Sequence, residues 1–287
     1  MSATKKIKLI ECPRDAMQGW SHFIPTQKKT AYINALLRVG FDTIDFGSFV
    51  SPKAIPQMAD TKEVLKGLDL SNTNSRLLAI IANLRGATEA VVYDEISYLG
   101  FPFSISETFQ QRNTNASIAD SFKVVSEIQE LCIKNRKELV VYISMGFGNP
   151  YGDEYNEGIL MHWVEKMAAL DIKIISLADT VGLAKPEQVT SAVSKVIPAF
   201  PGIETGVHLH SAPGNRVAKL DAALEHGCTR FDSAIKGIGG CPMAGDELVG
   251  NMDTEVMIAH FEQKGLHLEI DYEQLAVCNR MASEIFI

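Results

Sequence analysis

The sequence has no long apolar run, no excess of basic residues and few cysteines, and each absence excludes a class of protein. No stretch approaches the roughly 18 apolar residues of a membrane-spanning helix. The net charge of −8 repels phosphate backbones and anionic lipids, so we expect no nucleic-acid partner and no membrane partner. The apolar run Ile7–Ile10 is too short for the core of a signal peptide.

The cysteine pattern excludes a disulfide-stabilised scaffold. Their number is odd, their spacings are long and no C-x-x-C pair occurs; they are Cys12, Cys132, Cys228, Cys241 and Cys278. This pattern is typical of reduced thiols, and we therefore expect a cytoplasmic protein. The sequence also lacks low-complexity tracts and linkers, so residues 1–287 are expected to form one domain.

What the sequence does contain is an alternation of short β-branched runs and amphipathic segments. Eight strands are predicted at Ile7–Glu11, Asp42–Phe46, Leu77–Ala82, Ala90–Asp94, Leu139–Met145, Ile172–Ala178, Gly206–His210 and Thr229–Ala234. Helices are predicted at Thr26–Val39, Ser117–Asn135, Ile159–Leu170, Pro186–Ile197, Arg216–His226, Thr254–Lys264 and Asp271–Ile287. Eight β–α units predict an α/β protein with a single closed (β/α)₈ barrel, the last helix closing it. A doubly wound open sheet is the alternative, but no G-x-G-x-x-G follows the first strand.

In such a barrel the active site lies at the carboxyl ends of the strands, and several polar clusters fall there. His208 and His210 are two positions apart on one strand, so both side chains point into the barrel. With Asp15 and the amide oxygen of Asn251 they could hold Mg²⁺ or Mn²⁺, and Zn²⁺ also suits such ligands. The alternative is that both histidines are hydrogen-bonded interior residues.

Arg14 would place a guanidinium at the same end of the barrel. A buried guanidinium needs an anion, which a substrate carboxylate or a developing enolate would supply. The alternative is a structural ion pair with Glu11 or Asp45.

Cys241 lies in a glycine-rich loop, Gly237–Cys241, after the last strand. Such a loop is expected to act as a catalytic lid that delivers a proton donor, although most free cysteines are buried hydrophobic residues. No Lys-Ser/Thr follows the glycines, so the loop is not a phosphate-binding P-loop. Lys236 could form a Schiff base, but a solvated or ion-paired lysine is the more favoured interpretation.

These residues lie in motifs that resemble those of the 3-hydroxy-3-methylglutaryl-CoA lyase family, in the DRE-TIM metallolyase superfamily. The resemblance covers nearly the whole chain. Its motifs, in order, are Glu11–Gln18 (E-C-P-R-D-A-M-Q), Ser48–Asp60 (S-F-V-S-P-K-A-I-P-Q-M-A-D), Leu177–Gly182 (L-A-D-T-V-G), His208–His210 (H-L-H), Gly237–Ala244 (G-I-G-G-C-P-M-A) and Gly250–Glu255 (G-N-M-D-T-E).

The resemblance implies a metal-dependent lyase that cleaves 3-hydroxy-3-methylglutaryl-CoA to acetyl-CoA and acetoacetate, as in leucine catabolism and ketone-body formation. It implies an acyl-CoA substrate and a homodimer. The implied metal ligands are Asp15, His208, His210 and Asn251. Arg14 would face the thioester carbonyl and Cys241 would donate a proton, while His208 or a carboxylate would act as the base. The residues that would orient these ligands through hydrogen bonds are Glu11, Gln18, Asp45, Asp179 and Glu255.

Four positions depart from the family pattern and leave the acyl substrate open. Asp45 stands where the family usually has Glu, Val140 where it has Arg, Asn149 where it has Cys, and Ser211 where it has Asp. The alternatives are a related aldolase or Claisen-type synthase acting on another 3-hydroxy acid, and a non-catalytic barrel that binds acyl-CoA.

Overall fold

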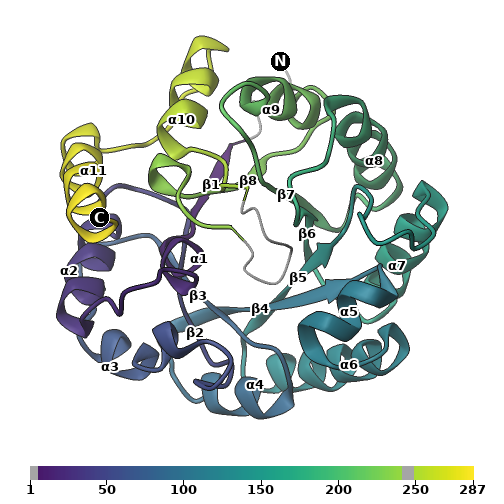
Figure 1. Ribbon diagram of the computed structural model, residues 1–287, viewed down its shortest axis with the longest axis horizontal. Coiled ribbons are helices and arrows are strands. Elements are labelled where there is room, and N and C mark those ends of the chain that lie inside the picture. The colour runs from purple at the N-terminus through teal and green to yellow at the C-terminus, as the bar shows by residue number, and fades with distance from the viewer. Residues whose placement is uncertain (1–5, 241–248) are drawn as a thin grey trace.

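Eight parallel strands form a closed barrel in the computed structural model, which describes residues 6–240 and 249–287 (Figure 1). The strands are β1 (Lys8–Glu11), β2 (Thr43–Ser48), β3 (Arg76–Ile80), β4 (Ile96–Ser104), β5 (Glu138–Ser144), β6 (Ile174–Asp179), β7 (Glu204–Leu209) and β8 (Arg230–Ser233). Each strand pairs with the next, and β8 pairs with β1, with Ile10 opposite Asp232. The predicted barrel is confirmed, and the open sheet is excluded.

Most helices form a ring outside the strands, while the short α1 (Pro13–Gln18) lies within that ring in the view down the barrel (Figure 1). The others are α2 (Thr26–Leu36), α3 (Thr61–Lys66), α4 (Leu84–Ala90), α5 (Glu107–Thr114), α6 (Ile118–Lys134), α7 (Glu157–Ala169), α8 (Pro186–Ala199), α9 (Arg216–Leu224), α10 (Thr254–Gln263) and α11 (Tyr272–Ile285), with 3₁₀ turns η1 (Pro56–Met58) and η2 (Ile235–Gly237). After α11, Phe286 packs edge-on against Trp20 and Tyr32, with ring centroids 5.3 Å and 6.3 Å away. Residue Phe286 thus meets α2 through Tyr32.

The fourth strand is the one element that the sequence placed wrongly. The run Ala90–Asp94 ends helix α4 and enters a turn, and the strand follows at Ile96–Ser104. Gly100 within β4 is needed for space, because a Cβ there would lie 2.5 Å from Cδ1 of Ile80 and 3.1 Å from the Tyr142 ring. A glycine in a strand weakens a prediction based on propensity, whereas here it lets the neighbouring strands fill the barrel.

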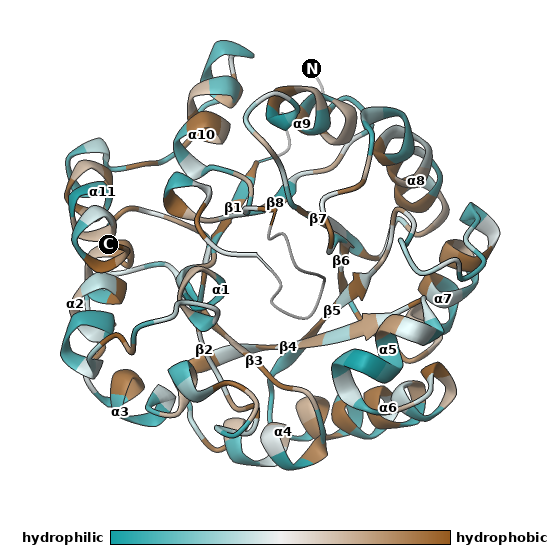
Figure 2. Cartoon of the chain, in the orientation of Figure 1, coloured by the Kyte–Doolittle hydropathy of each residue, from teal (hydrophilic) through white to brown (hydrophobic). Residues whose placement is uncertain are grey.

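The barrel interior is divided between an apolar and a polar half. Leu78, Ile80, Tyr98, Val140, Tyr142 and Ile174 form a separate apolar cluster from β3 to β6. Most other apolar side chains pack between the strands and the helices, so strands are mainly pale or brown while teal residues are frequent on the helices (Figure 2). None of the helices in the two described segments is long and apolar enough to cross a membrane. Strands β7 and β8 instead carry charged and imidazole side chains, namely Glu204, His208, Arg230 and Asp232.

Candidate metal centre and active site

Two histidines and one carboxylate converge at the carboxyl end of the barrel. His208 lies on β7 and His210 directly follows it, and their Nε2 atoms are 3.2 Å apart. A carboxylate oxygen of Asp15 lies within 4.8 Å of a ring nitrogen of each histidine. The structure therefore brings together three of the residues that the sequence suggested as ligands.

Asp15 lies on α1 rather than on the strand, because Pro13 starts this helix two residues after β1 ends. Its Oδ1 accepts hydrogen bonds from Nη1 of Arg14 (2.8 Å) and Nε2 of Gln18 (2.9 Å). Burial alone would raise the pKa of Asp15, but the charge of Arg14, assisted by the histidines, lowers it to about 2. The side chain is thus a carboxylate at neutral pH, as a metal ligand must be.

Asn251 reaches the same cluster from the segment before α10. Its backbone forms an antiparallel bridge with His210, and its Nδ2 donates to Oδ2 of Asp15 (2.7 Å) and to the carbonyl of Ile238 (2.9 Å). The amide oxygen is the atom left to bind a cation. Gly239 has φ +110°, and a Cβ there would lie 2.5 Å from Nδ2 of Asn251. The glycine-rich segment therefore packs directly on this amide.

Each histidine uses its other ring nitrogen for a hydrogen bond. Nδ1 of His208 lies 3.0 Å from Oδ2 of Asp232, and Nδ1 of His210 lies 3.0 Å from the carbonyl of Val249. Burial and the neighbouring His208 lower the pKa of His210 to about 4, so it is neutral and able to bind a metal. Burial also opposes the charged form of His208, but the hydrogen bond to Asp232 and the charges of Asp232 and Asp15 together outweigh it and raise the pKa.

Sequence reasoning missed Asp232. The parallel register places it directly opposite His208, and the two-residue period of β8 turns it into the barrel. An acidic residue at an inward position beside the H-x-H strand is the signal that could have found it. A carboxylate behind a ligating histidine fixes the tautomer of that histidine.

Arg14 is held by Asp45, the second of the two partners expected from the sequence, and not by Glu11. Its Nε lies 3.0 Å from Oδ2 of Asp45, and Nη2 contacts the same carboxylate. Burial raises the pKa of Asp45 to about 6 although the guanidinium opposes this. Two of the five guanidinium N–H groups remain for a ligand, one on Nη1 and one on Nη2.

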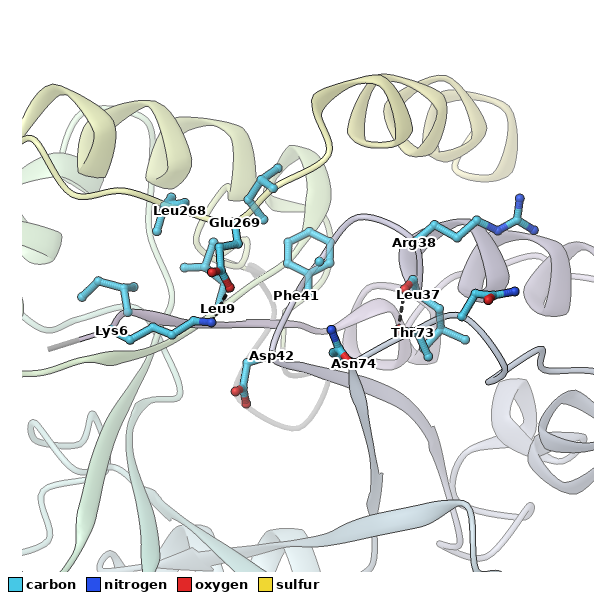
Figure 3. A pocket seen from close by; sticks show the side chains of 14 residues that line it. Lys6, Leu9, Leu37, Arg38, Phe41, Asp42, Thr73, Asn74, Leu268 and Glu269 are labelled. Carbon is cyan, nitrogen blue, oxygen red and sulfur yellow. Dashed lines mark hydrogen bonds and ion pairs between the residues drawn. The ribbon is translucent and has the colours of Figure 1, made fainter.

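A cavity of about 200 Å³ lies above these residues. Arg14, Asp15, His208 and His210 line one side, and the opposite wall is mainly apolar, with Val50, Ile55, Ile80, Pro102, Phe109 and Tyr142. A larger cavity, of about 310 Å³, lies between the start of β1, the end of α2 and the segment before α11 (Figure 3). It holds no cluster of ligating groups among the described residues, so the smaller cavity is the candidate active site.

The remaining carboxylates proposed from the sequence act on the backbone around the site. Glu11 is fully buried, accepts from the amide of Ile235 (2.9 Å) and from the hydroxyl of Thr254 (2.6 Å), and burial raises its pKa to about 8. Glu255 accepts from the amide of Lys236 (3.0 Å). Both therefore hold the segment after β8, and the side chain of Lys236 is exposed, which argues against a Schiff base.

Asp179 is joined to the histidine strand through a lysine that the sequence analysis overlooked. Lys219 on α9 is fully buried, and its Nζ donates to Oδ2 of Asp179 (2.6 Å) and to the carbonyl of His210 (2.7 Å). Asp179 also accepts from the amide of Ala184 (3.0 Å). This pair connects the ends of β6 and β7 and fixes the backbone of one histidine.

Three of the four unusual positions have structural roles of their own. Val140 belongs to the apolar interior cluster, and Asn149 accepts hydrogen bonds from the amides of Tyr151 and Asp153 in its loop. Ser211 contacts the sulfur of Met252 at 3.6 Å. The fourth, Asp45, pairs with Arg14 as described. Cys241 and residues 242–248 lie outside the described residues.

Comparison with known proteins agrees with this arrangement. Residues 6–281 match the model of the HMGL-like family. Hydroxymethylglutaryl-CoA lyase of Bacillus subtilis is 31% identical over 279 residues, which cover 96% of this chain and 91% of that protein. The human mitochondrial enzyme is 32% identical over 273 residues, covering 94% of this chain and 83% of the human protein.

Solved structures of such lyases superpose closely. An HMG-CoA lyase from Acinetobacter baumannii, in complex with coenzyme A and 3-methylmalate, has a TM-score of 0.91 and 34% identity, covering 100% of this chain and 93% of that one. The Bacillus subtilis lyase has a TM-score of 0.91 and 30% identity, covering 99% and 95%. Because the family model matches nearly its whole length and these lyases share its barrel at 30% identity or more, this chain belongs to the HMGL-like family.

Proposed function

We propose that this protein is a divalent-metal-dependent lyase that cleaves 3-hydroxy-3-methylglutaryl-CoA to acetyl-CoA and acetoacetate. The observation that carries the proposal is the convergence of Asp15, His208 and His210 beside Arg14 at the cavity. A metal site alone does not require a guanidinium, whereas a thioester enolate does. The substrate is assigned from the relatives, which are named hydroxymethylglutaryl-CoA lyases.

The donor set fits a divalent cation. Asp15 offers a carboxylate oxygen, His208 and His210 offer imidazole nitrogens, and Asn251 offers an amide oxygen. Mixed oxygen and nitrogen donors suit Mg²⁺ or Mn²⁺, and Zn²⁺ can also be held. When bound, such a cation would lower the pKa of a substrate hydroxyl and orient its carboxylate.

Different residues of the chain would carry out the two proton transfers and stabilise the developing negative charge. A base at this end of the barrel, His208 or one of the carboxylates, takes the hydroxyl proton as the carbon–carbon bond breaks. The two remaining N–H groups of Arg14 stabilise the negative charge that develops on the thioester oxygen. Cys241 protonates the carbon that leaves as acetyl-CoA.

A panel of 3-hydroxyacyl-CoA thioesters, assayed with Mg²⁺ or Mn²⁺, tests the proposal. We expect acetoacetate and acetyl-CoA from 3-hydroxy-3-methylglutaryl-CoA, in equal amounts and only with metal. Condensation of acetyl-CoA with a keto acid, without cleavage of this thioester, would instead indicate a Claisen-type synthase. Turnover of another member of the panel would move the assignment to a related acyl substrate. Binding without any turnover would indicate a non-catalytic barrel.

The role of Cys241 has a separate test. Cys241→Ser raises the pKa of the proton donor by several units, so turnover should fall while binding of metal and substrate persists. An alkylating reagent should inactivate the enzyme, and a bound substrate analogue should protect it. Cys12 is buried and should label slowly. A fully active Cys241→Ser variant, or labelling confined to Cys12, would contradict this role.

We also propose a reducing compartment and a homodimeric assembly for this protein. Cys12, Cys132, Cys228 and Cys278 are all free and buried, which supports a reducing compartment such as the cytoplasm. A homodimer is the assembly that the family resemblance suggests. Light scattering coupled to gel filtration would give the mass in solution, and a monomer would contradict the dimer.

A further inference from the structure

A second group of metal-binding side chains lies directly behind the first. Cys12 follows β1, His208 lies on β7 and Asp232 lies on β8, and these three strands are neighbours in the barrel. The sulfur of Cys12, a ring nitrogen of His208 and a carboxylate oxygen of Asp232 all lie within 4.8 Å of one another. Cys12 is 1% exposed and Asp232 is 3% exposed, so two of the three donors are closed to solvent, while His208 also lines the active-site cavity.

The donors of this group are incompletely satisfied. Oδ1 of Asp232 is buried and has no hydrogen-bond partner among the described residues. The thiol of Cys12 makes one long contact, 3.8 Å to the carbonyl of Ile10. A buried carboxylate oxygen without a partner is unfavourable, and such atoms in native proteins point to an ion or a water molecule. The unpaired oxygen of Asp232 is thus an observation independent of the thiol.

The chemistry of the three donors selects the kind of ion. A thiolate, a carboxylate and a neutral imidazole carry two negative charges, so a divalent cation gives a complex with no net charge. A neutral complex is the one that a dry interior tolerates, because uncompensated buried charge is costly. Thiolate is a soft ligand that favours Zn²⁺ or Co²⁺ over Mg²⁺. We propose that Cys12, His208 and Asp232 form a second metal site, selective for thiophilic divalent ions.

The two sites share one imidazole and therefore exclude each other. A neutral imidazole has one ring nitrogen free of a proton. In the Asp15 site Nε2 of His208 would face the cation, and Nδ1, 3.0 Å from Oδ2 of Asp232, would keep its proton and donate it to that carboxylate. An ion bound at Nδ1 moves that proton to Nε2 and displaces the thiol proton of Cys12 to solvent. A thiophilic ion in the second site thus prevents His208 from binding an ion with Asp15.

Cobalt is the probe that distinguishes the sites, because bonds between thiolate and Co²⁺ absorb in the near ultraviolet. We expect metal-free protein to develop this band on addition of Co²⁺. Cys12→Ser and Cys12→Ala should both lose the band, while Cys132→Ser, a matched change of another buried cysteine, should keep it. Mn²⁺ binding, measured by spin resonance, should persist in Cys12→Ser because the Asp15 site does not use the thiol.

Other outcomes overturn the proposal. Absence of the band in wild-type protein, or its persistence in both Cys12 variants, means that Cys12 does not bind the ion. Loss of the band in Cys241→Ser alone assigns the thiolate to the other cysteine. The proposal does not depend on the lyase activity of the protein. If Cys12→Ser still binds Mn²⁺, the Asp15 site is intact in that variant, and the cobalt band then reports on the second site alone. Circular dichroism of each variant confirms that it is folded.

Discussion

The two ends of the barrel use buried and half-buried charges differently. At the amino ends of the strands, Lys8 and Arg230 both pair with Glu204, the latter at 3.1 Å, so cations there meet anions. At the carboxyl ends, ring nitrogens of His208 and His210 face each other at 3.2 Å beside a carboxylate. Groups that satisfy one another close a structure, whereas groups that converge on a common space need a ligand. Buried ion pairs also lie at the carboxyl end, Arg14 with Asp45 and Lys219 with Asp179, but ligating groups converge on a cavity there, so the comparison assigns the chemistry to that end.

Removing a histidine should break the carboxyl-end cluster completely. His210 is neutral at pH 7 because burial lowers its pKa to about 4, so it competes poorly for protons and well for a cation. His210→Ala should lose bound metal and all detectable lyase activity together, as measured by elemental analysis and assay. Glu204→Gln, the matched change at the opposite end, should keep both. Full activity of His210→Ala in metal-free buffer would refute the assignment.

Arg14 should affect both catalysis and the fold, because it is paired with Asp45. Arg14→Gln is expected to lower kcat on the order of 10²-fold. It also leaves a buried carboxyl without its cation, which should cost about 3–5 kcal/mol of unfolding free energy. The double variant Arg14→Gln/Asp45→Asn should recover most of that stability and none of the activity. If activity returns with stability, the role of Arg14 is structural.

Asp232 should matter through His208 rather than through direct contact with substrate. Asp232→Asn keeps the shape but weakens the hydrogen bond that fixes the tautomer, so affinity for Mn²⁺ should fall about 10- to 100-fold. Calorimetric titration measures this directly. Unchanged affinity together with a lower melting temperature would show that Asp232 serves only the fold.

Glu11 should make stability depend on pH. Burial raises its folded pKa to about 8 from an ordinary 4.5, so the folded state binds the proton more tightly than the unfolded state. Its contribution is therefore most favourable below pH 4.5 and is lost as the pH rises to about 8, on the order of a few kcal/mol. In Glu11→Gln the unfolding free energy should change less between pH 5 and pH 8.5 than in the wild type, as measured by urea unfolding at the two pH values. Parallel wild-type and variant profiles would contradict it.

The smallest effect is expected at the amino end, beside the larger cavity. Lys6 is directed at Glu269, but their side chains are 71% and 69% exposed (Figure 3). Exposed pairs of this kind contribute little because water screens them. Lys6→Ala should leave the melting temperature and activity unchanged. A clear loss of stability would show that this end depends on more than its buried pairs.

The sequence predicted the barrel because periodicity survives in seven of its eight strands. It failed at β4, where the β-branched residues Val91 and Val92 follow a helix while Gly100 and Pro102 lie within the strand. Propensity describes a residue alone, whereas Gly100 is selected by the side chains that β3 and β5 place beside it. Tertiary packing of this kind is not visible in local patterns.

The site was predictable where the residues follow a spacing rule and not where they depend on strand register. His208 and His210 lie two apart and were expected to converge. Asp232 and Lys219 reach the same strand from later elements, and only the three-dimensional arrangement shows their contacts. Similarly, Asp45 rather than Glu11 meets Arg14, because Glu11 points outward to Thr254.

The bond between Asp15 and Asn251 joins positions 236 apart in the sequence. No folding intermediate that lacks the closed barrel can assemble these ligands, so ions cannot stabilise one half of the chain in advance of the other. We therefore expect the ligands to come together after the rate-limiting step, so that metal leaves the refolding rate almost unchanged and slows unfolding. Bound metal would then extend the lifetime of the native state rather than help the chain to reach it.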